Sequence, residues 1–123
     1  MRRSRRSLFL IGAAVAIGLT ASGCSAASTS SIQLGAATVV VDVRTSGEYA
    51  GGHLDGAVNI DLESATFASA VSQLDPAADY VVYCQSGNRS AQAAQVMDAA
   101  GLDVQDAGGI SQAAQATGLS IVR

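Results

Sequence analysis

The chain has 123 residues with seven basic and ten acidic side chains, which gives a formal net charge of −3 at pH 7. Four of the seven arginines lie within the first six positions, and the chain contains no lysine, so the part beyond them is strongly acidic. Binding to a nucleic-acid backbone requires clustered positive charge, so this class of function is excluded. The length suits one small domain.

Residues 1–23 have the pattern of an export signal peptide. Four arginines precede an apolar run at 8–19, and small residues follow it. This run is short against the ~20 residues that cross a bilayer as a helix, which favours export over a permanent anchor. Residues 4–9 also resemble a twin-arginine signal, so the choice between the two export routes stays open.

The small residues at the end of this signal resemble a bacterial lipobox, which ends at Cys24. The resemblance implies a lipoprotein that carries an acyl chain such as palmitate on Cys24 and is anchored to the outer face of the cell membrane. Residues 24–36 would then form a tether and residues 37–123 the folded domain. The alternative is a disulfide between Cys24 and Cys84, since two cysteines in an exported chain can pair.

Strand and helix patterns alternate through the folded part. A continuous apolar run predicts a strand over 38–43 that is buried on both faces, and two shorter strands are predicted at 59–60 and 80–84. Apolar spacing predicts helices over 66–74 and 90–100. The second helix should bury Ala93, Val96, Met97 and Ala100 and end at Gly101. This alternation predicts an α/β fold with a mainly parallel central sheet flanked by helices.

Cys84 ends the strand predicted at 80–84, and a polar loop containing Gly87 leads from it into the second helix. A thiol in this position would face loop N–H groups and the positive end of a helix, and both favour the thiolate. Reactive groups in parallel sheets also gather at the carboxyl ends of strands. We therefore predict a nucleophilic cysteine with a lowered pKa that needs neither a metal nor a cofactor. The alternative is an inert, buried cysteine at the end of a strand.

Two segments resemble the signatures of rhodanese-like domains. The first runs from Val41 to Ile60 and the second is the loop from Cys84 to Ser90, in the order that the family has them. A third, shorter match is the glycine pair at 108–109. The resemblance extends from 39 to about 122, and it implies the rhodanese α/β fold and a cysteine that carries sulfane sulfur as a persulfide.

By this resemblance Cys84 is the nucleophile, and the backbone of the next six residues binds the outer sulfur: Gln85, Ser86, Gly87, Asn88, Arg89 and Ser90. Arg89 would supply a fixed positive charge for an anionic donor such as thiosulfate, or alternatively would form a surface ion pair at the start of the helix. The spacing from Cys84 to Arg89 is Cys-x4-Arg, whereas the phosphatases that resemble rhodaneses have Cys-x5-Arg. The shorter loop favours sulfur over phosphate or arsenate.

Asp42, Arg44, Glu48 and His53 belong to the first signature, which is mainly structural in the family. We expect Arg44 and Glu48 to form an ion pair that fixes the loop after the first strand. His53, together with Gly56, is expected to shape the next turn, and Asp42 to accept hydrogen bonds from loop amides near the site.

Together these features predict an extracytoplasmic sulfurtransferase or sulfur carrier. It would accept sulfur from thiosulfate, polysulfide or a persulfide on Cys84 and pass it to a thiophilic acceptor. An acidic protein repels the thiosulfate dianion at long range, so we expect thiosulfate to be a poor donor beside polysulfide and persulfides. The alternative function is a non-catalytic module, tethered to the membrane, that uses the same loop to hold an anion or a partner protein.

Overall fold

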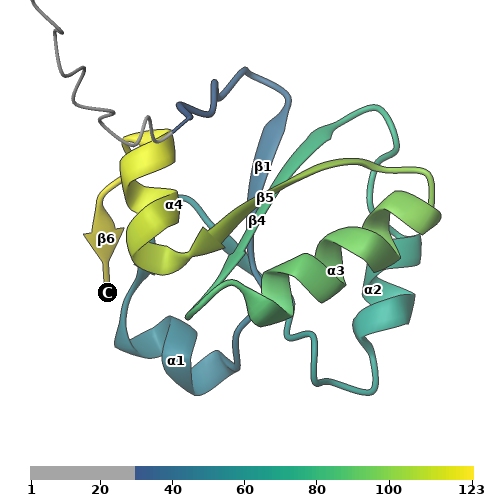
Figure 1. Ribbon diagram of the computed structural model, residues 1–123. Coiled ribbons are helices and arrows are strands. Elements are labelled where there is room, and N and C mark those ends of the chain that lie inside the picture. Colours follow the sequence, from purple (N-terminus) through teal and green to yellow (C-terminus); the bar gives the residue numbers. More distant parts are fainter. Residues whose placement is uncertain (1–29) are drawn as a thin grey trace, which may run out of the picture.

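The structure is a computed structural model that describes residues 30–123 (Figure 1). The predicted signal peptide, the predicted lipidation site Cys24 and the first part of the predicted tether lie outside these residues. Among the helices of residues 30–123, none has both the length and the apolar character needed to cross a membrane.

A four-stranded parallel sheet forms the centre of the domain, with the strand order β3-β1-β4-β5. Its strands are β1 (Thr38–Asp42), β3 (Val58–Asn59), β4 (Asp79–Cys84) and β5 (Asp103–Gly109). The two central strands, β1 and β4, are rich in valine and tyrosine, which suit a pleated surface that is buried on both sides. A separate antiparallel pair joins β2 (His53–Leu54) to β6 (Ile121–Val122). The predicted mainly parallel α/β fold is confirmed.

Helices cover both faces of the sheet, as Figure 1 shows. The four helices of the described chain are α1 (Ser46–Gly51), α2 (Phe67–Ser72), α3 (Asn88–Ala99) and α4 (Ile110–Thr117). One hydrophobic core packs α2 and α3 against the sheet, and a second core lies on the other face with α4 and α1. Successive strand residues alternate between these cores, since Val82 and Cys84 face α3 whereas Val81 and Tyr83 face the second core.

Helix α3 is placed by its small, buried face. Ser90, Ala93 and Met97 are fully buried, and Gly101 follows the helix with a positive φ of 86°. The predicted end of the helix is therefore confirmed, but the predicted burial of Val96 and Ala100 is wrong. Because the helix advances 100° per residue, Val96 lies roughly 80° from the midpoint between Ala93 and Met97 and faces solvent. Ala100 is exposed because it is the C-cap and lies beyond the last helical residue, Ala99.

Among residues 30–123, packing into the core begins at Ile32, inside the segment predicted as a tether. Its side chain is buried in the second core, and its N–H donates to the carbonyl of Ala116 at 2.8 Å. Further along, Asp42 pairs with Tyr83 in the sheet register, so the carboxyl ends of β1 and β4 lie at the same edge. The two signature segments of the sequence meet at this edge.

Candidate active site

Cys84 is the last residue of β4, and three residues separate it from α3. The backbone N–H of Gly87 donates to the sulfur at 2.9 Å, and the sulfur lies 3.5 Å from the hydroxyl of Ser90, which accepts from the thiol and can donate to the thiolate. Gly87 has a φ of 103°, a left-handed conformation that glycine adopts without strain, and this turns its N–H back toward Cys84. The loop therefore surrounds the sulfur with hydrogen-bonding groups.

The pKa of Cys84 is lowered from its ordinary value of 9.0. Burial, the largest single influence, raises the pKa, but it is outweighed by hydrogen bonds from the Ser90 hydroxyl and from the amides of Ser90, Gly87 and Ser86. Arg89 and Cys84 also attract each other, since Cys84 helps to raise the pKa of Arg89, but these hydrogen bonds have the larger effect on the thiol. The thiolate is thus stabilised by short-range N–H and O–H dipoles.

Cys84 also has the burial expected of an inert cysteine. Its side chain has no exposed surface, and it packs in the core that contains Val43 and Met97. The site therefore combines the lowered pKa predicted for a nucleophile with the burial predicted for an inert cysteine at the end of a strand. The thiol of Cys84 is free, and Cys24, its possible disulfide partner, lies outside the described residues. Because the sulfur has no exposed surface, a reagent reaches it only when neighbouring groups move.

The glycine pair at 108–109, at the end of β5, packs against the loop that follows Cys84. Gly109 pairs with Cys84 across a β-bulge, and a Cβ atom on Gly109 would lie only 2.7 Å from the carbonyl oxygen of Gln85. A Cβ atom on Gly87 would in turn lie 3.6 Å from the Cα of Gly108. Main chain thus packs directly on main chain, which only glycine permits at position 109.

Arg89 lies in the first turn of α3, and its guanidinium group forms a bidentate ion pair with Glu48. The two N···O distances are 2.8 and 2.9 Å, and the carboxylate of Glu63 is 3.8 Å away. This pair lowers the pKa of Glu48 from 4.5 to about 2 and raises the pKa of Arg89. Of the two interpretations of Arg89, the geometry shows the ion pair at the start of the helix.

The predicted ion pair between Arg44 and Glu48 is wrong. Arg44 is buried and pairs with the buried Asp42 at 2.7 Å, while Glu48 caps α1 through Thr45 and faces Arg89. The physical reason is burial, since a guanidinium inside the protein requires a counterion that is also inside. Asp42 accepts the predicted loop amide, but this is the N–H of Arg44 and not one from the cysteine loop.

Arg44 links this pair to the cysteine loop. Its Nη1 donates to the side-chain oxygen of Gln85 at 3.0 Å, and its Nη2 donates to the carbonyl of Gly52 at 2.6 Å. Asn59 completes the arrangement by donating to the carbonyls of Asp42 and Arg44. Sequence reasoning did not identify Asn59, although it stands at the end of the first signature.

His53 is placed by local contacts. Its ring stacks on Tyr49 with a centroid separation of 3.8 Å, and its Nδ1 lies 2.9 Å from the carbonyl of Tyr49. Gly56 follows in the turn with a φ of 79°. Within residues 30–123, no three His, Cys, Asp or Glu side chains come close enough together to bind a metal ion.

These elements define a class of α/β protein in which a cysteine at the end of a central parallel strand lies inside a loop of N–H donors. The family model of the rhodanese-like domain matches residues 26–115 of the sequence. The chain therefore belongs to the rhodanese-like domain family.

Individual relatives agree with this assignment. The chain is 33% identical over 75 residues to the thiosulfate sulfurtransferase PspE of Escherichia coli (strain K12), and the match covers 60% of this chain and 72% of that protein. The structure described as rhodanese with anions from E. coli superposes with a TM-score of 0.58 at 31% identity, covering 71% of this chain and 99% of that one. A rhodanese-related protein from Thermoplasma volcanium gives a TM-score of 0.59 at 31% identity, with coverages of 70% and 84%.

Proposed function

We propose that this protein is a sulfurtransferase that carries sulfane sulfur as a persulfide on Cys84. The observation that carries the proposal is the N–H of Gly87, 2.9 Å from a sulfur whose pKa is lowered although it is buried. Membership of the rhodanese-like family and 33% identity to a thiosulfate sulfurtransferase support the same type of reaction. The donor and the acceptor are part of the proposal.

The first step is attack of the Cys84 thiolate on the outer sulfur of the donor. With thiosulfate, a bond forms between the two sulfur atoms, the donor S–S bond breaks, and its electron pair leaves with sulfite. The product is the persulfide anion Cys84–S–S⁻, whose charge remains within reach of the loop amides of Ser86 and Gly87. A thiophilic nucleophile then attacks the outer sulfur and releases the Cys84 thiolate.

Access to the sulfur is part of the reaction because Cys84 has no exposed surface. Neighbouring groups must move before a donor can contact the sulfur, and one residue of the loop, Gln85, is held by its hydrogen bond to Arg44. The same burial favours the second candidate function, a non-catalytic module that binds an anion or a partner through the intact loop.

Uptake of sulfur separates these two functions. The full chain in detergent is incubated with thiosulfate or with polysulfide, and intact mass is measured before and after cyanide. We expect one added sulfur that cyanide removes, no uptake by Cys84→Ser, and normal uptake by the matched variant Cys24→Ser. If the wild-type protein accepts sulfur from no donor, the binding module is the better interpretation.

The proposed setting is the outer face of the cell membrane, with Cys24 acylated after export. The support is the sequence pattern of residues 1–24. We expect the protein to partition with membranes and to incorporate labelled palmitate, and Cys24→Ala to do neither. Equal labelling of the two proteins would refute the lipid anchor.

A further inference from the structure

We propose that Glu48 determines the class of sulfur donor: by occupying Arg89, it withholds positive charge from dianionic donors and leaves the site to donors of lower charge, such as persulfides. This inference rests on the proposed sulfurtransferase function and specifies its substrate. Two observations carry it, namely how completely Arg89 is engaged and which charges surround the cysteine loop.

Arg89 is fully engaged on the side that faces α1. Both terminal nitrogens of its guanidinium contact Glu48, one on each carboxylate oxygen. Glu48 is itself fixed, because its Oε2 accepts hydrogen bonds from the backbone N–H and the hydroxyl of Thr45, both at 3.0 Å. A donor that binds to Arg89 would have to displace the Glu48 carboxylate, which is hydrogen-bonded both to Arg89 and to Thr45.

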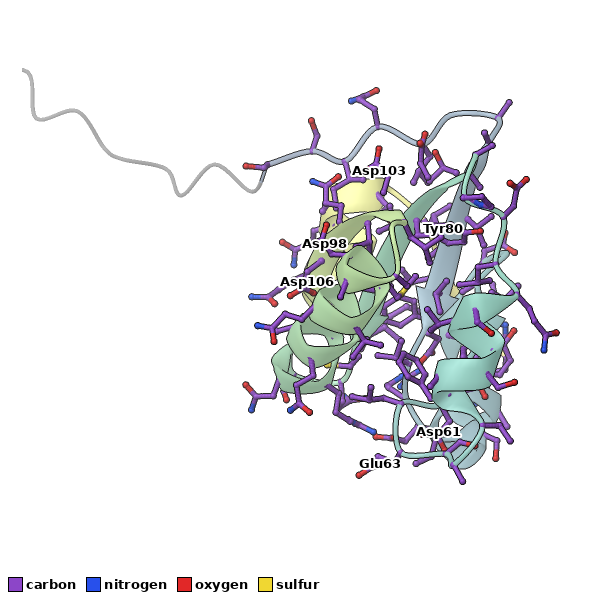
Figure 2. All side chains as sticks on the ribbon, turned by 90° about the vertical axis from the view of Figure 1, so that its right-hand side faces the viewer. Asp61, Glu63, Tyr80, Asp98, Asp103 and Asp106 are labelled. Carbon is purple, nitrogen blue, oxygen red and sulfur yellow. The ribbon has the colours of Figure 1, made fainter. Side chains whose placement is uncertain are left out.

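The charges around the loop are also unfavourable to a dianion. Glu63 lies 3.8 Å from the same guanidinium, and Asp61 is adjacent to Glu63 through a hydrogen bond to its N–H. Figure 2 shows Asp61 and Glu63 together at one end of the domain, away from Asp98 at the other. One arginine therefore faces two carboxylates at this end, and Arg44, which contacts the loop through Gln85, is paired with Asp42.

The thiolate depends on Arg89 less than on its hydrogen-bond partners. Arg89 and Cys84 attract each other, because Cys84 helps to raise the pKa of Arg89, but the larger stabilisation of the thiolate comes from Ser90 and the loop amides. The ion pair between Arg89 and Glu48 thus affects the approach of a charged donor more than the formation of the reactive sulfur. A zwitterionic or monoanionic persulfide avoids the repulsion that thiosulfate meets.

The test compares two donors on matched charge variants of the full chain. The donors are thiosulfate and cysteamine hydropersulfide, in which an ammonium group balances the persulfide charge. Transfer from the second donor breaks its S–S bond, forms the persulfide on Cys84 and releases the cysteamine thiolate. Rate constants of sulfur uptake are obtained by intact mass after quenching, for wild type, Glu48→Gln and Asp98→Asn.

Wild type should take sulfur faster from cysteamine hydropersulfide than from thiosulfate. Glu48→Gln should raise the thiosulfate rate about fivefold or more at low salt and change the cysteamine hydropersulfide rate less than about twofold. Asp98→Asn removes the same charge from the exposed, distant part of α3, so it should change neither rate by more than about twofold.

Two outcomes separate the inference from the function. If sulfur is taken up normally but Glu48→Gln and Asp98→Asn affect thiosulfate equally, the inference is wrong and the sulfurtransferase function stands. If no variant accepts sulfur from either donor, the function itself is wrong. Should Glu48→Gln not fold, the wild-type salt dependence decides: added NaCl should speed uptake from thiosulfate only, and slower uptake would overturn the inference.

Discussion

Replacing Gly109 by alanine should disturb the sulfur site although it changes no residue that hydrogen-bonds to the sulfur. Gly109 has an ordinary backbone conformation, with φ −72° and ψ 160°, so alanine meets no local strain there. Its Cβ would lie 2.7 Å from the carbonyl oxygen of Gln85 and 3.3 Å from the Cα of Ser86, whereas real Cβ contacts essentially never fall below 3.0 Å. Because both neighbours are main-chain atoms, the loop must move as a whole.

The expected result has two parts. Overpacking of this kind costs about 1–3 kcal/mol in the free energy of unfolding. Displacement of Gln85 and Ser86 also lengthens the contacts of the loop amides with the Cys84 sulfur, so the pKa of the thiol should rise toward its ordinary value. A misplacement of a few tenths of an ångström should slow sulfur uptake on the order of tenfold.

Urea denaturation measures the first part, and the pH dependence of iodoacetamide alkylation, followed by intact mass, measures the second. The matched control is Gly51→Ala at the end of α1, where a Cβ meets nothing within 4 Å. This control should leave the alkylation midpoint unchanged. If Gly109→Ala keeps the wild-type midpoint and the wild-type rate of uptake, the glycine pair does not position the loop and the reasoning is refuted.

Three further predictions concern named hydrogen bonds and ion pairs. Ser90→Ala removes a hydroxyl that lowers the pKa of Cys84, so the alkylation midpoint should rise and Ser90→Thr should restore it; equal midpoints would contradict this role. The pKa of Glu48 is depressed, so its ion pair should stabilise the fold above pH 4.5 and lose this effect as the pH falls toward about 2. Urea midpoints of Glu48→Gln should therefore vary less than those of wild type between these pH values, and parallel curves would count against the pair. Asp42→Ala leaves Arg44 buried without a counterion and should cost about 3–5 kcal/mol in urea denaturation; a loss below about 1 kcal/mol would show that the guanidinium finds water.

The elements with a regular apolar pattern could be predicted from the sequence. The β1 run is continuous and β-branched, the β4 run ends at Cys84, and α3 ends at a glycine with positive φ. Strand β5 gave no such signal, because most of its side chains are polar and exposed. Helix α4 was also missed, since it contributes only Ile110 and Ala113 to the buried core.

The candidate site could likewise be predicted from the sequence only in part. Cys84 and the following loop could be identified because they are contiguous in the sequence. The partners of Arg44 and Glu48 could not, because sequence distance does not indicate which carboxylate is buried beside Arg44 and which faces α3. The close contact between Gly109 and the loop depends on the register of β4 against β5, including a bulge that no local pattern specifies.

The loop that binds the Cys84 sulfur packs against backbone: the amide of Gly87 contacts the sulfur, and Gly108 and Gly109 lie against the main chain of this loop. The side chains of Gln85 and Asn88 are exposed, and that of Gln85 accepts a hydrogen bond from Arg44. The acidity of the thiol therefore depends mainly on the loop backbone and Ser90, whereas the proposed selectivity for donors depends on Glu48 and Arg89. Natural variation or protein engineering can therefore change the exposed side chains around the loop while the backbone that binds the sulfur stays the same.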